Sequence, residues 1–169
     1  MESTRRMKKR LLHLIRHAKS DWSTVGQSDF ERPLNARGRI DAPMMAERFF
    51  TRFTSKKAFH VSAATRTRET ADLFSKGYLD KISSTHLHQG LYHASAEDLL
   101  EFVSLLPENE MEVVIFTHNN GVSEFVSHLA QQNIEMPTCA IATFELEEWA
   151  RVSSREAVLI RFDYPKLDT

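Results

Sequence analysis

The chain has 169 residues, a formal net charge of −1 and a single cysteine. This length suits one domain with a sizeable core, and we interpret residues 1–169 as a single domain. The balanced charge argues against overall attraction to nucleic acid or to an anionic membrane, and a lone cysteine excludes an internal disulfide and fits a reducing compartment.

The first ten residues are rich in Lys and Arg, and a short apolar run follows them. A signal peptide begins in a similar way, but this apolar run is interrupted by His13 and stops at Arg16, so it is too short and too polar. No segment approaches the roughly 18 apolar residues that a membrane span needs. We therefore predict a solvated basic tail over residues 1–10 and a cytoplasmic protein. A role for the tail in steering phosphate or a partner is the alternative.

Strand-like and helix-like segments alternate from residue 11 to the C-terminus. Short apolar runs predict strands, and apolar residues at helical spacing predict helices. The predicted strands are 11–16, 58–63, 113–116, 140–146 and 157–162, and the predicted helices are 35–53, 65–77, a helix that starts at Ser95, and 122–130. Ser95 and Asp98 have the spacing of a capping box. This alternation predicts a three-layer α/β/α sandwich with a mostly parallel central sheet.

Charged and imidazole side chains follow three of the predicted strands. The first strand ends in Arg16 and His17, Arg66 and Arg68 lie just after the second, and the third runs into His118. In parallel sheets these ends meet at one edge, where ligands bind. Arginine suits bidentate phosphate recognition, a neutral imidazole can attack phosphorus, and a protonated one can offset charge on the oxygens. Each residue alone has a common structural explanation, and their convergence is what indicates a phosphate site.

Four segments in this order resemble those of a known family. They are LIRHAKSDW at 14–22, DFERPLNARGRIDA at 29–42, SAATRTRETA at 62–71 and THNNGVSEF at 117–125. The chain resembles the histidine phosphatase superfamily, also called phosphoglycerate mutase-like, and within it the short SixA-type phosphohistidine phosphatases. The resemblance implies a metal-independent phosphatase with a covalent phosphohistidine intermediate and no cofactor.

The resemblance also assigns residues to roles. His17 matches the nucleophile, Arg16 and Arg66 match the phosphate-binding arginines, and His118 matches the second imidazole, which we expect to be protonated. Ser23 lies where many relatives place a polar side chain that contacts phosphate. Two imidazoles in different protonation states predict a bell-shaped pH–rate profile.

The sequence departs from the family pattern at two places. Ala18 replaces the usual Gly after the nucleophile, so we expect a negative φ there. No acidic residue takes the place of the general acid, since the corresponding region contains Gln89; Asp21 or Glu31 could supply the acid instead. A phosphoramidate needs this acid less than an alkyl phosphate does, so the gap favours a phosphohistidine substrate.

The spacing of the segments favours an open site. Only 45 residues separate Ala71 from Thr117, and one helix and a possible strand occupy them, which leaves little or no room for a cap domain. An open site suits a phosphorylated protein side chain. A small phosphorylated metabolite, phospho-Ser or phospho-Thr as substrate, a mutase, and a phosphate-binding regulatory module without turnover are the alternatives. We expect no nucleic-acid or membrane partner.

Other phosphate chemistries do not match the sequence. Cys139 is followed six residues later by Glu145 rather than Arg, so we interpret it as a strand residue and not as the nucleophile of a cysteine phosphatase. No Gly-rich nucleotide loop is followed by Lys. No carboxylates or histidines have metal-ligand spacing, and six histidines are expected to be structural or on the surface: His13, His60, His86, His88, His93 and His128.

Overall fold

The computed structural model describes residues 8–167 and contains one six-stranded sheet. The strands are β1 (Arg10–Arg16), β2 (Lys57–Ser62), β3 (Ile82–His88), β4 (Glu112–Thr117), β5 (Ile141–Leu146) and β6 (Val158–Asp163), in the order β3-β2-β4-β1-β5-β6. Strands β3, β2, β4 and β1 are parallel, whereas β5 is antiparallel to both β1 and β6. The predicted mostly parallel sheet is confirmed, and residues 1–7 of the predicted basic tail lie outside the described residues.

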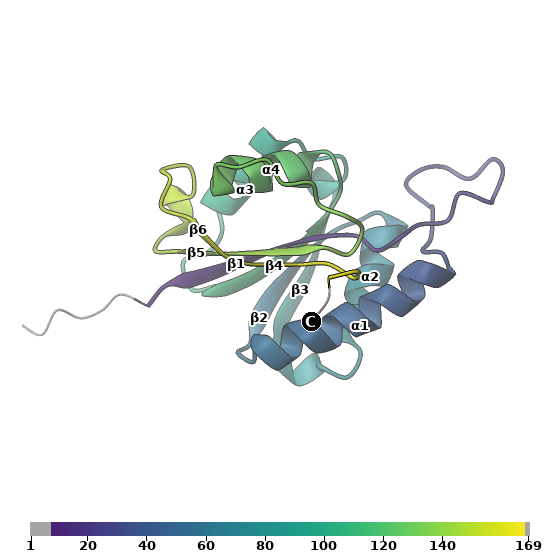
Figure 1. The fold of residues 1–169 in the computed structure, drawn as a ribbon, viewed down its shortest axis with the longest axis horizontal. Coiled ribbons are helices and arrows are strands. Elements are labelled where there is room, and N and C mark those ends of the chain that lie inside the picture. The colour runs from purple at the N-terminus through teal and green to yellow at the C-terminus, as the bar shows by residue number, and fades with distance from the viewer. Residues whose placement is uncertain (1–7, 168–169) are drawn as a thin grey trace, which may run out of the picture.

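Helices cover both faces of the sheet, which confirms the three predicted layers. They are α1 (Ala36–Arg52), α2 (Thr65–Ser75), α3 (Ala96–Ser104) and α4 (Gly121–Ala130). Figure 1 shows α1 and α2 on one face and α3 and α4 on the other. The segment between α2 and β4 contributes β3 to the sheet and α3 to a helical layer, so it forms no cap over the sheet edge.

Two apolar clusters form the core, one on each face. Neighbouring residues of β1 point to opposite faces, so Leu14 belongs to the cluster under α3 and α4, and Ile15 belongs to the cluster under α1 and α2. Phe49 of α1 is buried in the second cluster, and Phe125 of α4 is buried in the first. Burial on both faces explains why the central strands are continuous apolar runs rather than alternating ones.

The helix starts follow from local capping chemistry. The Asn35 side chain caps α1 by accepting a hydrogen bond from Gly38 N at 2.9 Å. The predicted capping box of α3 is confirmed, because Ser95 Oγ accepts from Asp98 N at 3.1 Å and Asp98 Oδ2 accepts from Ser95 N at 2.9 Å. These caps satisfy backbone donors that a helix end leaves without partners.

One possible element is confirmed and one local prediction needs correction. The possible strand between Ala71 and Thr117 is β3, an edge strand whose residues are exposed or half-buried, so it lacks the apolar run that marked the other strands. Cys139 is not a strand residue, because it lies in the turn before β5 with a φ of 62°. Its backbone N–H donates to the carbonyl oxygens of Arg16 and His17, at 3.0 Å each, and so ties this turn to the end of β1.

Within residues 8–167, no helix is long and apolar enough to cross a membrane.

Candidate active site

The carboxyl ends of β1, β2 and β4 bring four predicted residues together. Arg16, His17, Arg66 and His118, here called the active-site cluster, all line one cavity of about 430 Å³ at this edge. The ring centroids of His17 and His118 are 5.2 Å apart. Arg66 comes from the first turn of α2, directly after β2, whereas His118 lies in the turn that leads into α4. The convergence expected from strand order is therefore present in the fold.

A close backbone contact holds two segments of this edge together. Gly121, the first residue of α4, packs so tightly that an added Cβ would lie 1.9 Å from the carbonyl oxygen of Ala94. A larger residue would push the segment that contains His118 away from the one that contains His93. The geometry of the cavity therefore depends on the missing side chain at position 121.

Hydrogen bonding defines the tautomer of His17. Its Nδ1 lies 2.7 Å from the carbonyl oxygen of Ala18, and a carbonyl only accepts, so Nδ1 carries the proton. Nε2 then carries a lone pair, and it accepts from Arg66 Nε at 3.3 Å. Burial, with a smaller contribution from Arg66 and Arg16, lowers the pKa of His17 to about 3. The hydrogen bond to Ala18 opposes this shift but does not cancel it. His17 is therefore a neutral imidazole with its lone pair directed toward an arginine.

Ala18 adopts the predicted backbone conformation. It is not among the residues with positive φ, so the turn accepts a Cβ in place of the family's Gly. Its N–H donates to Thr70 Oγ1 at 3.0 Å, which ties the His17–Ala18 peptide to α2.

His118 differs from the prediction of a protonated ring. Its Nε2 lies 2.7 Å from Ser62 Oγ, whereas Nδ1 is buried without a partner among the described residues. Burial lowers its pKa, and His17 and Arg66 lower it further, while Asp29 offsets only part of this effect. The protein groups around His118 therefore keep it neutral, because two further basic groups stand close to a ring that water does not reach.

The Arg16 guanidinium has one nitrogen that is hydrogen-bonded to the protein and one that is buried without a partner. Its Nη1 donates to the carbonyl oxygen of Met136 at 2.9 Å, and its Nε is buried without a partner. Burial lowers the pKa of Arg16, Arg66 lowers it further, and Glu135 opposes both. Both Arg16 and His118 thus carry a buried polar atom that a phosphoryl oxygen could satisfy.

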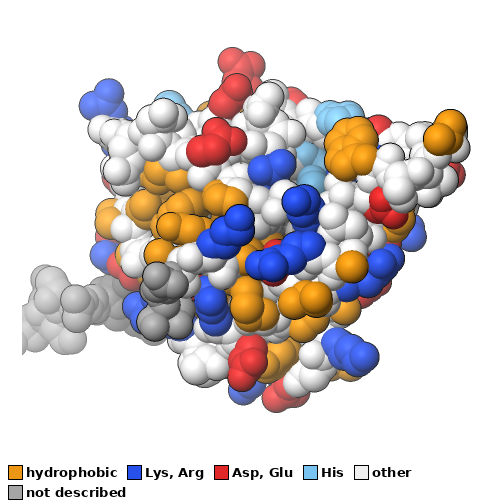
Figure 2. Space-filling model, turned by 45° about the vertical axis from the view of Figure 1, so that its right-hand side comes forward, with side chains coloured by type: hydrophobic (Ala, Val, Ile, Leu, Met, Phe, Trp, Pro, Cys, Tyr) orange, Lys and Arg blue, Asp and Glu red, His pale blue; other side chains and the backbone are white. Residues whose placement is uncertain are grey.

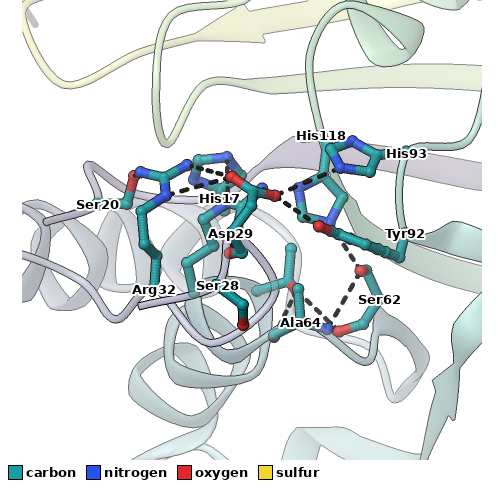
Figure 3. A network of polar contacts seen from close by, with 12 residues as sticks. His17, Ser20, Ser28, Asp29, Arg32, Ser62, Ala64, Tyr92, His93 and His118 are labelled. Carbon is teal, nitrogen blue, oxygen red and sulfur yellow. Dashed lines mark hydrogen bonds and ion pairs between the residues drawn. The ribbon is translucent and has the colours of Figure 1, made fainter. Parts of the chain in front are cut away.

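Asp29 is a central residue that the sequence analysis did not identify. Arg66 donates to its carbonyl oxygen at 2.6 Å and to Oδ2 at 3.0 Å, and Arg32 donates to Oδ1 at 2.9 Å and 3.2 Å. Oδ2 also accepts from the Tyr92 hydroxyl at 2.6 Å and lies 3.3 Å from His93 Nε2. Figure 3 shows the carboxylate between these side chains. It orients Arg66 beside His17.

The surroundings of Asp29 keep it ionised. Burial raises its pKa, but hydrogen bonds from Tyr92, Arg32 and Arg66 outweigh burial and hold the pKa well below its usual range. An ionised carboxylate cannot donate a proton. Asp29 is therefore suited to orient cations and an imidazole, and not to act as the missing general acid.

His93 also lies at this cavity, which refines its expected place as a structural or surface residue. Its side chain is 59% exposed, yet it lines the cavity and its ring centroid is 6.0 Å from that of His118. Its φ of 56° is a left-handed conformation that costs free energy for a residue with a Cβ. The sequence contained a signal for Asp29, because Asp29 and Arg32 lie three residues apart in a segment that resembles the family. It contained no comparable signal for His93.

Three further predicted residues lie outside the lining of this cavity. Asp21 is half-buried, and its Oδ1 accepts from Ser23 N at 2.7 Å; hydrogen bonds from Ser23 lower its pKa. Ser23 and Glu31 are exposed, and Glu31 N donates to Ser28 O at 3.1 Å. None of the three contacts the active-site cluster, because the exposed loop after β1 carries them away from the sheet edge.

The structure also bears on two alternative chemistries, a cysteine nucleophile and a metal site. Burial strongly raises the pKa of the Cys139 thiol, which disfavours the thiolate that a cysteine nucleophile requires. In the part of the chain that the structure describes, no group of three or more His, Cys, Asp or Glu side chains is placed to hold a metal ion.

The model of the histidine phosphatase superfamily (branch 1) matches residues 12–91, which include Arg16, His17 and Arg66. Over this segment the chain is similar to the histidine phosphatase superfamily. This likeness, together with the cavity geometry, supports phosphatase activity.

Solved structures share the fold over nearly their whole length. A protein assigned as the phosphohistidine phosphatase SixA of Agrobacterium tumefaciens is 23% identical, with a TM-score of 0.80 over 92% of this chain and 98% of that one. The protein histidine phosphatase SixA in complex with tungstate is 20% identical, with a TM-score of 0.75 over 92% and 97%. A phosphoserine phosphatase of Entamoeba histolytica is 16% identical, with a TM-score of 0.63 over 92% and 98%.

A curated relative from Arabidopsis thaliana, an uncharacterised chloroplastic protein, is 29% identical over 144 residues. The match covers 80% of this chain and 66% of the relative, so the chain spans about two thirds of that protein.

Proposed function

We propose that this protein is a metal-independent phosphohistidine protein phosphatase that works through a phosphohistidine intermediate on His17. The observation that carries the proposal is the fixed tautomer of His17: Nδ1–H donates to Ala18 O, and a neutral Nε2 lies 3.3 Å from Arg66 Nε. A neutral imidazole with a directed lone pair beside a phosphate-binding cation is suited to attack phosphorus.

In the first step, Nε2 of His17 forms the bond to phosphorus while the bond from phosphorus to the leaving group breaks. Nδ1 keeps its proton, and Ala18 O stabilises the positive charge that the ring acquires. Arg16 and Arg66 hold the phosphoryl oxygens, and the buried Arg16 Nε gains a partner there.

His118 can assist this step without a second proton. Ser62 Oγ lies 2.7 Å from Nε2, and we assign the single proton of the neutral ring to Nδ1, the nitrogen without a partner, so that the Ser62 hydroxyl donates to Nε2. That Nδ1–H is a donor for a phosphoryl oxygen. This arrangement replaces the protonated His118 of the sequence prediction and agrees with the lowered pKa.

In the second step, water attacks phosphorus from the side that the leaving group occupied, and His17 leaves as a neutral imidazole. His93 Nε2 lies 3.3 Å from Asp29 Oδ2, and we assign the ring proton to Nε2 beside this carboxylate, which leaves Nδ1 of His93 to take the proton from water. By reversal of the same transfer, a protonated His93 supplies a proton to a leaving group in the first step. The Asp29–His93 pair thus does the work that a carboxylic acid does elsewhere.

The preference for a phosphohistidine protein rests on two features. The acid available at the cavity is the imidazolium of His93, because Asp29 is held ionised; an imidazolium is a weaker acid than a carboxylic acid, and a phosphoramidate depends least on a strong acid. No cap closes the sheet edge, so a protein side chain can enter. The alternative, a phosphatase of phosphoserine, phosphothreonine or a small metabolite, is favoured by the shared fold of the Entamoeba histolytica phosphoserine phosphatase. A cytoplasmic location stays a prediction.

The deciding experiment measures phosphate release from a phosphohistidine peptide in EDTA, for the wild type and His17→Ala. We expect release by the wild type and none by the variant. His17-dependent hydrolysis of 4-nitrophenyl phosphate without release from the peptide would move the substrate to the alternative class. No turnover of either compound would favour a phosphate-binding module, and EDTA-sensitive activity restored by metal would contradict metal independence.

A further inference from the structure

A second cavity, of about 500 Å³, adjoins the catalytic one. Lys19 and Thr138 line both, so the two form one continuous depression at the carboxyl edge of the sheet. Arg37 and Lys166 lie along the second cavity, and Tyr164 and Pro165 form part of its apolar wall. We call this second cavity the basic groove. Figure 2 shows Lys and Arg side chains close to the histidines of this edge, with apolar side chains between them.

The charge of the groove is unbalanced. Asp41 is its single lining carboxylate; it is 5% exposed and pairs with Arg37 Nε at 3.0 Å. Within residues 8–167, Lys19 and Lys166 form no ion pair. Because Arg37 and Asp41 pair with each other, Lys19 and Lys166 remain as two lining cations without a counter-charge, in a chain whose formal net charge is −1.

The groove is built on a rigid base. An added Cβ at Gly38, in the first turn of α1, would lie 2.3 Å from the carbonyl oxygen of Lys19. The same carbonyl accepts from Asn35 N at 3.0 Å. The backbones that carry Lys19 and Arg37 are thus held against each other. The first turn of α1 also contains no acidic residue, so the positive end of the helix dipole adds to the field of these cations.

From this geometry we propose that the basic groove binds an acidic polypeptide segment next to the phosphorylated residue of the substrate protein. The proposal rests on the phosphatase function above and specifies its substrate. Carboxylates of the segment would approach Lys19 and Lys166, and its apolar atoms would pack on Tyr164 and Pro165. Continuity with the catalytic cavity places this segment beside the phosphoryl group. A small metabolite would have no atoms to place along the apolar wall.

The test uses two phosphohistidine peptides of equal length, one with Asp and Glu around the phosphohistidine and one with Asn and Gln. Their binding to His17→Ala protein is measured by fluorescence anisotropy at low salt, so binding is followed without turnover. Lys166→Glu is the test variant, because Lys166 lies in the groove and outside the catalytic cavity. Lys76→Glu, which makes the same charge change at the exposed C-cap of α2, is the matched control.

We expect the acidic peptide to bind more tightly than the neutral one, and Lys166→Glu to weaken acidic-peptide binding about 3- to 10-fold, with Lys76→Glu nearly neutral. Hydrolysis of 4-nitrophenyl phosphate by a Lys166→Glu enzyme with an intact His17 should match the wild type. Equal binding of the two peptides, or equal effects of the two lysine variants, would overturn the groove proposal. Wild-type protein that binds the acidic peptide but releases no phosphate from it would instead overturn the proposed phosphohistidine phosphatase function.

Discussion

Two buried clusters at opposite ends of the same strands contain the same kinds of side chain. His13, Lys57 and Glu112, here called the structural cluster, lie toward the amino-terminal ends of β1, β2 and β4. The active-site cluster lies at the carboxyl ends of these strands. Both contain buried imidazoles and cations, and they differ in how completely their polar atoms are paired.

The structural cluster satisfies its own groups. His13 Nδ1 lies 2.7 Å from Thr143 Oγ1, and His13 Nε2 lies 2.8 Å from Glu112 Oε1. Lys57 Nζ donates to Phe53 O at 3.0 Å and lies 3.5 Å from Glu112 Oε1. No fully buried side-chain N or O of these three residues lacks a partner. Such a network stabilises the fold and has no group left to offer a ligand.

The active-site cluster keeps two such groups free, Nδ1 of His118 and Nε of Arg16. A buried polar atom without a partner costs about 1–3 kcal/mol. The fold bears that cost at the edge where a phosphoryl group would supply the missing partners. Unsatisfied hydrogen-bonding capacity therefore distinguishes His118 from His13, whereas residue type does not; His17 differs from both because its Nε2 accepts from an arginine.

The largest effect should come from replacing the histidine of each cluster by alanine and comparing the two variants. His17→Ala should lower kcat/KM about 10⁴-fold or more, because the nucleophile is lost, with little change in stability. His13→Ala should do the reverse and lower the free energy of unfolding while the folded protein retains its turnover. Steady-state kinetics and urea denaturation of both variants check this. A His17→Ala protein that retained more than about 1% of wild-type activity would contradict the assignment.

Removing the carboxylate of the structural cluster should be the next largest effect. Glu112→Ala leaves Lys57 without its counter-charge and His13 without a hydrogen-bond partner in a buried site, which should lower the free energy of unfolding by about 3–5 kcal/mol. Urea denaturation measures the change. The double variant Lys57→Met with Glu112→Leu should recover most of this loss, since an apolar pair leaves no charge unpaired. A cost below about 1 kcal/mol for Glu112→Ala would show that the cluster behaves like a surface ion pair.

A smaller effect is expected at His93, and it should depend on the leaving group. His93→Asn should lower kcat for phenyl phosphate, whose leaving group is poor, about 10²-fold, and lower kcat for 4-nitrophenyl phosphate much less. Asparagine suits this position because it tolerates left-handed backbone. His128→Asn, at an exposed position of α4, is the control. Equal losses for the two aryl phosphates would indicate that His93 positions other residues and transfers no proton.

The smallest effect is a gradual loss of stability in acid. The pKa values of His13, His17 and His118 are all lowered below the ordinary value of 6.5, chiefly by burial. The unfolded chain therefore binds protons as pH falls through 6.5, while the folded chain does not until pH approaches about 3 for His17. The free energy of unfolding should decrease steadily from about pH 7 to about pH 4, and His118→Asn should make this decrease less steep. Urea denaturation at several pH values measures both slopes; a stability independent of pH in this window would exclude neutral burial of these rings.

The sequence alone determined the parts of this protein that depend on local chemistry and strand order. Apolar runs located β1, β2, β4, β5 and β6, and helical spacing and caps located the four α-helices, because these signals act between residues close in the chain. The parallel order of strands placed Arg16, His17, Arg66 and His118 at one edge, because parallel strands present the same end to the same side.

Only the tertiary structure decided how those residues are charged and paired. The roles of Asp29 and His93 arise from contacts between loops distant in sequence, and no periodicity records them. The neutral state of His118 follows from burial beside His17 and Arg66, which is a property of the packed edge and not of the residue. Strand β3 could be predicted only as a possible strand without bounds, because an exposed edge strand needs no apolar run. The basic groove forms only where α1, the turn before β5 and the segment after β6 meet.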